Sequence, residues 1–162
     1  MLKLYKLDDE TQEYWQTWQD GDNHTIHWGR LGATGESETV ASSFLRPASR
    51  KVQRLIDRKV GEGFRPMDVE DHRVLLVEYP VADRFANEAE LEKRYRLQDQ
   101  LDEILGWTGL GHCDGGSSGE GTMEACCFVV DFALAKAVIA DALKNTEFED
   151  YSRIFDENAE LS

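Results

Sequence analysis

The sequence predicts an α+β protein made of two small domains. Two observations predict this class. Short segments of alternating or aromatic-rich residues, typical of strands, are interleaved with longer segments whose apolar residues recur at helical spacing. Charge also differs between the halves: residues 1–70 carry 10 basic and 12 acidic side chains, whereas residues 71–162 carry 8 and 20. A difference of this size indicates two units with different partners.

Four short strands are predicted first. Residues 2–7 alternate apolar and basic side chains, residues 13–18 are rich in aromatic side chains, and residues 25–30 alternate again. Gly21 lies between two aspartates and marks the turn between the second and third of these strands. Residues 38–43 form the fourth predicted strand, which completes a small antiparallel sheet.

A helix is predicted over residues 47–60. Proline favours the first turn of a helix and glycine favours its end, and Pro47 and Gly61 stand at these two places. The apolar residues of this segment fall at helical spacing and would pack one stripe on the sheet. They are Val52, Leu55, Ile56 and Val60.

The opposite side of this helix is strongly basic. Between Arg46 and Val60 there are six basic residues and a single acid, Asp57. In a chain of net charge -14, this is the one surface suited to phosphate. The alternative is a solvated helix face that the acidic second half partly neutralises. The residues expected to contact phosphate are Arg50, Arg54 and Arg58, which recur every four residues and share one face, together with Lys51.

Pro66 marks the end of the first domain, because proline lacks an amide donor and disfavours helical geometry in the residue before it. We therefore expect domains at residues 1–67 and 72–162. The second domain, with 20 acidic against 8 basic side chains over residues 71–162, is a poor candidate for binding nucleic acid.

A motif in the first half resembles a known family. Trp28-Gly29-Arg30 follows the aromatic strand with Tyr14, Trp15 and Trp18. Leu31-Gly32, Gly35-Glu36, the helix and the ending Lys59-Val60-Gly61-Glu62-Gly63-Phe64 come after it. In this order the features resemble the WGR domain, which is named for the tripeptide, over roughly residues 1–67.

The resemblance implies an open antiparallel sheet with one helix across it. WGR domains occur in poly(ADP-ribose) polymerases, where they contact DNA ends and neighbouring domains, and in bacterial proteins related to a molybdate-metabolism regulator. Carried to this chain, Trp28 would pack on the sugar-phosphate near a strand end, and Arg30 would contact DNA or a partner domain. The alternatives are a core aromatic for Trp28 and a structural salt bridge for Arg30. The remaining residues are too few for the catalytic region of the polymerases.

In the second half, the pattern of apolar residues and turns predicts the order strand-helix-strand-strand-helix-strand. This order is the ferredoxin-like βαββαβ arrangement. In that topology the first and third strands are central and apolar on both faces, as the runs over residues 74–77 and 125–130 are. The predicted strands are residues 74–79, 110–113, 122–130 and 151–155, and the predicted helices span 87–105 and 131–143, capped by Asn87 and Asp131. Helices would cover one face of this sheet. The first domain, a protein partner or a second copy in a homodimer would cover the other.

No catalytic or metal site stands out in the sequence. The segment 106–121 holds seven glycines, yet it lacks the lysine and hydroxyl side chain of a phosphate-binding loop, so we expect a mobile hairpin loop or a partner-binding loop. His112, Cys113 and Asp114 form the best candidate for cysteine catalysis or zinc binding. Adjacent strand residues point to opposite faces, however, so these side chains cannot easily cooperate. We predict no catalytic residue, cofactor or metal.

Composition excludes other classes. The longest apolar run, Ala125 to Val130, is far shorter than the roughly 18 residues that a membrane span needs. The first six residues show no signal-peptide core, and three cysteines, two of them adjacent, argue against a disulfide framework. We therefore expect a cytoplasmic, non-enzymatic protein that binds DNA ends or nicks through residues 28–60. The alternatives are a regulatory or protein-interaction adaptor that uses the same face and the acidic second domain, and a small hydrolase or metal protein centred on His112.

Overall fold

The computed structural model describes residues 1–160. The chain divides into two compact units, Met1–Val69 and a second unit that begins at Glu70. Each unit combines helix with a four-stranded antiparallel sheet, so the predicted α+β class is confirmed. The short 3-10 helix η1, Val69–Asp71, lies where the two units join along the chain. No helix within residues 1–160 is both long enough and apolar enough to cross a membrane.

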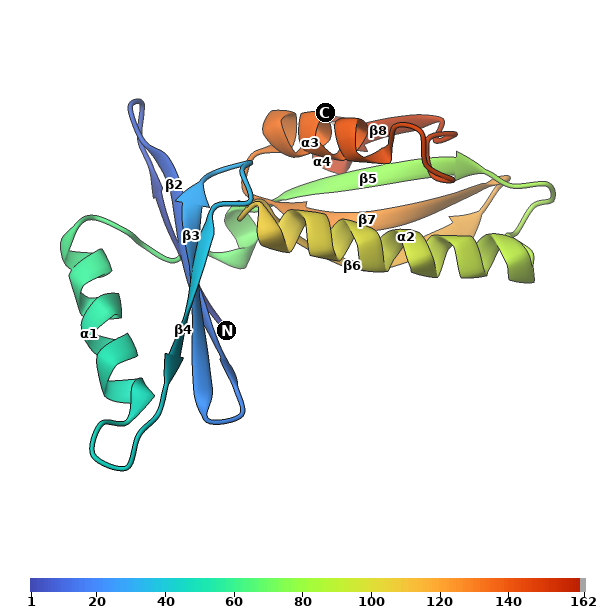
Figure 1. Ribbon diagram of the computed structural model, residues 1–162. Helices are drawn as coiled ribbons and strands as arrows, with labels where there is room; N and C mark the ends of the chain where they lie inside the picture. The colour runs from blue at the N-terminus through green and yellow to red at the C-terminus, as the bar shows by residue number, and fades with distance from the viewer. Residues whose placement is uncertain (161–162) are drawn as a thin grey trace. The chain divides into compact units, whose positions relative to one another are not determined.

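The sheet of the first unit is a simple meander in which each strand pairs with the next along the chain (Figure 1). Gly21 forms the turn between β2 and β3, and its φ of 60° is a conformation that glycine adopts without strain. The strands are β1 Leu2–Leu7, β2 Gln12–Asp20, β3 Asn23–Arg30 and β4 Glu36–Ala41. Each lies within two residues of its predicted limits.

Helix α1, Ala48–Gly61, buries one stripe against this sheet. Ala48 and Val52 are buried, and Ile56 packs at the margin of the same cluster. Val60, which we expected in this stripe, is 39% exposed. Residues four apart drift by about 40° around a helix. In the series Ala48, Val52, Ile56 and Val60, the fourth side chain has therefore left the buried face. The other members of the cluster are Leu4, Trp15, Ile26, Val40 and Phe64, with Leu2, Trp28 and Leu55 at its edge.

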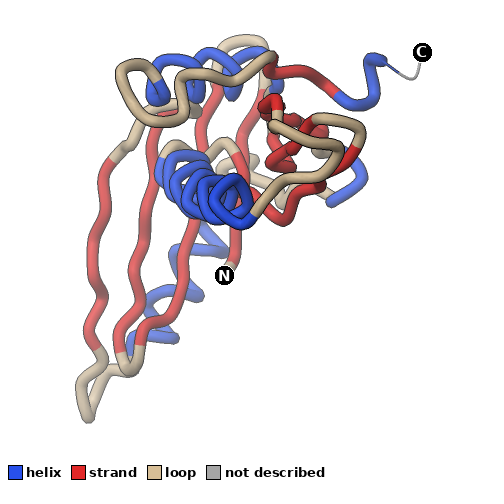
Figure 2. Tube along the Cα trace, turned by 90° about the vertical axis from the view of Figure 1, so that its right-hand side faces the viewer, coloured by secondary structure: helices blue, strands red, loops and turns tan. Residues whose placement is uncertain are grey.

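The second unit has the strand order β6-β7-β5-β8, with every neighbouring pair antiparallel. Together with the element order, this is the ferredoxin-like arrangement, and β5 and β7 are the central strands as predicted. Helix α2 contacts β6, β7 and α3, and it is viewed down its axis in Figure 2. The strands are β5 Arg73–Pro80, β6 Gly111–Gly119, β7 Thr122–Val129 and β8 Arg153–Asp156, and the helices are α2 Glu88–Trp107, α3 Phe132–Leu143 and α4 Glu157–Glu160.

The glycine-rich segment differs from the prediction. Most of it is not a loop, because Gly111–Gly119 form the edge strand β6 and pair with β7 through a bulge between Cys113 and Gly116. Only Glu120 and Gly121, both with positive φ, make the reversal into β7. Gly115 and Gly116 at the bulge and Gly121 in the tight reversal satisfy backbone geometry, so these three need no ligand to explain them.

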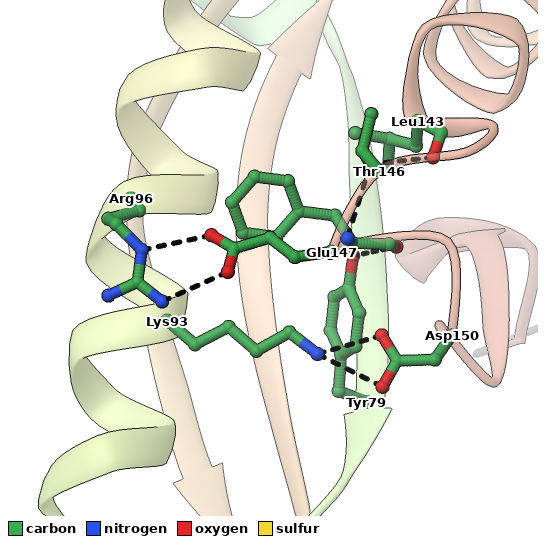
Figure 3. Close-up of polar contacts among 8 residues, drawn as sticks. Tyr79, Lys93, Arg96, Leu143, Thr146, Glu147 and Asp150 are labelled. Carbon is green, nitrogen blue, oxygen red and sulfur yellow. Dashed lines mark hydrogen bonds and ion pairs between the residues drawn. The ribbon is translucent and has the colours of Figure 1, made fainter.

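Polar contacts hold α2 to the segment that follows α3 (Figure 3). Arg96 pairs with Glu147 at 2.9 Å, and Lys93 pairs with Asp150 at 2.7 Å. The Tyr79 hydroxyl, on β5, donates to the carbonyl of Phe148 at 2.8 Å, and burial raises the pKa of this tyrosine. These contacts join residues 147–150 to α2 and β5, and the buried bond of Tyr79 is the one least exposed to solvent.

Candidate nucleic-acid interface

A groove lies beside the first half of α1. The turn 42–47 connects β4 to the helix, and together these three parts enclose a groove of about 660 Å³. This volume is within the range of about 300–1,000 Å³ that small-ligand sites occupy. The lining residues that matter for charge are Arg46, Arg50, Lys51 and Arg54, and the others include Thr39, Ser43, Leu45 and Pro47.

The cations of the groove are only partly neutralised. Lys51 pairs with Glu38 at 3.2 Å, and both side chains are more than half exposed, so this ion pair is weak. None of the ion pairs found within residues 1–160 includes Arg46, Arg50 or Arg54. Three guanidinium groups therefore face solvent in one groove of an acidic protein.

The two ends of α1 use their basic residues differently. At the C-terminal end, Arg58 and Lys59 both pair with Glu62 at 3.0 Å, and they lower its pKa. Cations there also complement the negative end of the helix dipole. Arg50 and Lys51 lie in the first turn, at the positive end, where a cation is unfavourable for the helix. Helix stability therefore explains the positions of Arg58 and Lys59, and it does not explain those of Arg50 and Lys51.

Trp28 and Arg30 lie on the α1 side of the sheet, as strand alternation predicts. Trp28 is paired in register with Trp15 and packs, partly buried, against the cluster under α1. Arg30 is exposed at the end of β3, directly opposite Glu13 in register. No ion pair of Arg30 is present among the residues described, so the proposed structural salt bridge is not formed in this structure.

The central glycine of the tripeptide has a packing role. A Cβ on Gly29 would lie 2.7 Å from the Cα of Gly35, and a Cβ on Gly35 would overlap the carbonyl of Trp28. The segment 31–35 can therefore fold back over β3 only when both positions are glycine. This brings the carbonyl of Ala33 to 2.8 Å from the Tyr14 hydroxyl, which donates to it.

A buried histidine, His27, also contacts the segment 31–35. His27 Nε2 is 2.5 Å from the carbonyl of Thr34 and donates to it, so Nδ1 is the acceptor for the Gln16 amide at 2.7 Å. The Tyr14 hydroxyl is 3.1 Å from His27 Nε2, and burial raises the pKa of Tyr14 to about 12. Tyr14, His27 and Gly29 therefore hold the 31–35 segment against β3, the strand that ends at Arg30.

The structure does not bring all of the predicted residues together. The groove lies at the start of β3, where Asn23 pairs with Ala41, one of the groove-lining residues. Arg30 lies at the opposite end of the same strand. At about 3.3 Å per residue, Arg30 is roughly 23 Å along the strand from that position. Arg58 is not among the groove-lining residues either. The groove therefore contains Arg50, Lys51 and Arg54 of the predicted set.

The sequence reasoning missed two features of this region. Arg46 belongs to the basic stretch but not to the predicted site, and it lines the groove. Phe44 and Leu45, which precede it, are 102% and 84% exposed. The signal in the sequence for this feature is an apolar pair between the strand predicted over residues 38–43 and the helix-starting Pro47.

The residues considered for catalysis are separated. The His112 ring stacks on Phe128, with centroids 5.4 Å apart, on the sheet face away from the helices. Cys113 points to the other face, opposite Cys127 in register, and burial together with the Cys113 thiol raises the pKa of Cys127. Within the described part of the chain, no three His, Cys, Asp or Glu side chains are grouped to hold a metal ion.

Comparison with known proteins assigns the first unit. Residues 1–71 match the family model of the WGR domain. The resemblance drawn from Trp28-Gly29-Arg30 and its neighbours is thereby confirmed. The WGR match covers less than half of the 162 residues, and it leaves the ferredoxin-like unit without a named family.

The other comparisons add little. No curated protein matches the chain. Among solved structures, a crystal structure of a Bacteroides fragilis protein, determined as a structural genomics target, is 22% identical over 42% of this chain, with a TM-score of 0.38. The aligned part spans 19% of that protein's length.

Proposed function

We propose that this protein binds DNA without catalysing a reaction on it, and that the WGR unit does so through the groove beside α1. The observation that carries the proposal is the groove itself, in which Arg46, Arg50 and Arg54 are exposed to solvent in a chain of net charge -14. Unpaired guanidinium groups are suited to phosphate, which they bind through paired hydrogen bonds.

Two further features support phosphate as the ligand. The groove lies at the N-terminal end of α1, which has no side-chain cap and no acid in its first turn, so the helix dipole adds positive potential there. Arg50 and Arg54 are one helical step of four residues apart, or about 6 Å. That spacing is comparable with the distance between successive phosphates of one strand.

The proposal predicts strong salt dependence. Four cations that each displace a counterion give a slope of about -3.6 for log affinity against log salt concentration, so affinity should fall roughly a hundredfold between about 50 and 200 mM salt. Fluorescence anisotropy with labelled nicked, blunt-ended and single-stranded DNA at both salt concentrations measures this slope.

The test variant is Arg50→Gln/Arg54→Gln. It should reduce the magnitude of the salt slope by about 2 and weaken binding to every DNA tested, because two phosphate contacts are lost. The charge-matched control is Lys136→Gln/Lys144→Gln, which removes two exposed cations of the second unit and should leave affinity within about twofold. Two single variants, Arg30→Gln and Arg58→Gln, show how far the interface extends beyond the groove.

The alternative function is a protein-interaction adaptor. In that case the wild-type protein would bind none of these DNAs at low salt, and the Arg50→Gln/Arg54→Gln variant would behave like its control. Affinity capture with the wild-type and variant proteins as paired baits would then be the next experiment.

A further inference from the structure

The turn between β4 and α1 exposes two apolar side chains at a fixed position. Phe44 is 102% exposed and Leu45 is 84% exposed, and no other two consecutive large apolar residues are both exposed in the described chain. Full exposure of a phenylalanine contributes nothing to the folded core, so this pair needs another explanation.

Hydrogen bonds hold this turn in place. The amide of Ser43 donates to the carbonyl of Arg46 at 3.1 Å, and the amide of Arg46 donates back to Ser43 at 3.2 Å. The Ser43 hydroxyl accepts a further bond from the Arg46 amide at 3.1 Å. Ser42 Oγ accepts from the Ala48 amide at 3.0 Å, which ties the turn to α1. Phe44 and Leu45 therefore project from a closed two-residue turn, and little backbone entropy is lost when a ligand contacts them.

The turn is continuous with the basic groove. Leu45 and Arg46 both line the groove, so a phosphate held there would place its own base beside the apolar pair. Phenylalanine and leucine are side chains that proteins insert between bases, and any exposed base offers a face on which an aromatic ring can stack.

We propose that the Phe44–Leu45 turn stacks on unpaired bases at a gap or end of DNA whose phosphates occupy the groove. This inference rests on the proposed DNA binding and specifies its target as DNA with accessible bases. An anionic lipid surface is the other ligand that combines negative charge with an apolar interior. Nucleic acid fits better because Arg46, Arg50 and Arg54 line a recess along α1, whereas a flat bilayer would need its cations at the level of the protruding tip.

The experiment compares a covalently closed DNA minicircle with the same circle containing a short single-stranded gap. The full-length wild-type protein should prefer the gapped circle by about tenfold, and Phe44→Ala, which alters no groove-lining residue, should remove this preference while leaving affinity for the closed circle unchanged. A 2-aminopurine base in the gap should change fluorescence with the wild-type protein and not with this variant. The control, Phe85→Ala, truncates an aromatic residue that is 58% exposed in the second unit and should keep the preference.

The outcomes separate this inference from the proposed function. If Arg50→Gln/Arg54→Gln weakens binding to both circles while Phe44→Ala binds the gapped circle like wild type, the groove binds DNA and the stacking role is wrong. If the arginine variant changes neither affinity, the proposed function itself fails. Equal losses on both circles, or binding to phosphatidylserine vesicles that depends on Phe44 while the circles are not distinguished, would also overturn the stacking role. Phe44 is exposed, so the thermal midpoint of Phe44→Ala should match that of wild type.

Discussion

At the scale of single residues, the tripeptide that identifies the first unit serves packing as much as recognition. Trp28 extends the cluster under α1, and Gly29 allows the 31–35 segment to approach β3. Arg30 is the one member whose side chain is exposed. A Trp28→Ala variant would therefore disturb the core as well as any DNA contact, and it is a poor probe of binding.

Gly35 offers a direct test of this packing role. Its φ is 62°, and a Cβ would overlap the carbonyl of Trp28 and the hydroxyl of Tyr14. We predict that Gly35→Ala lowers the free energy of unfolding by roughly 2–4 kcal/mol, as strain and steric overlap combine. Urea unfolding followed by tryptophan fluorescence measures the change.

The matched control for this variant is Gly61→Ala in the last turn of α1. A Cβ there meets no atom within 4 Å, so the change should be neutral or stabilising by up to about 1 kcal/mol. Equal stability of the two variants would show that the 31–35 segment can move away from β3 without loss.

At the scale of elements, the two long helices begin in different ways. Helix α2 has a capping box: the Asn87 side chain accepts from the Glu90 amide and the Glu90 carboxylate accepts from the Asn87 amide, both at 2.9 Å. Helix α1 has Pro47 at the same position and no side-chain cap. At this end the Ala48 amide donates to Ser42 Oγ and the Arg50 amide donates to the Pro47 carbonyl, so the turn 42–47 takes over part of the role of a capping side chain.

The cap of α2 carries a prediction at this scale. Asn87→Ala should destabilise the second unit by about 1 kcal/mol, because an amide in the first turn loses its acceptor. Asn87→Asp keeps an acceptor oxygen and should stay within about 0.5 kcal/mol of wild type. Chemical denaturation followed by circular dichroism measures both variants, and an unchanged Asn87→Ala protein would mean that solvent replaces the cap without cost.

At the scale of the whole molecule, charge sets the conditions for binding. The second half carries most of the excess acid, and its repulsion of nucleic acid weakens with salt at the same time as the attraction by the groove. A measured salt slope therefore reports the balance of the two, and the difference in slope between wild type and Arg50→Gln/Arg54→Gln reports the phosphate contacts of the groove.

The sheet of the second unit has an apolar face on the side opposite α2 and α3. The face opposite α2 and α3 carries Val74, Cys126 and Phe128 from its central strands, and apolar sheet faces are covered in stable proteins. We predict that a second copy covers this face, so that sedimentation velocity at increasing protein concentration detects a homodimer. Because the net charge of -14 opposes self-association, a dimer should strengthen between about 50 and 300 mM salt. A monomer at every protein and salt concentration tested would contradict this prediction.

Local patterns were sufficient to predict most of the elements. The first sheet, α1, the order of elements in the second unit and the WGR resemblance all followed from alternation, helical spacing, glycine turns and a short motif, because these signals depend on neighbouring residues. The second sheet's strand order followed as well, since the two densest apolar runs belong to β5 and β7, the central strands.

Other features depend on which residues meet across the fold. Six basic side chains between Arg46 and Val60 looked like one surface, yet the turn 42–47 and β4 enclose only the first part of it, and Glu62 pairs with Arg58 and Lys59. The glycine-rich segment looked like a loop, and pairing with β7 made it a strand. Backbone partners and salt-bridge partners are chosen in three dimensions, so composition alone predicted where charge and glycine are concentrated, and only tertiary structure decided which arginines are left for a ligand.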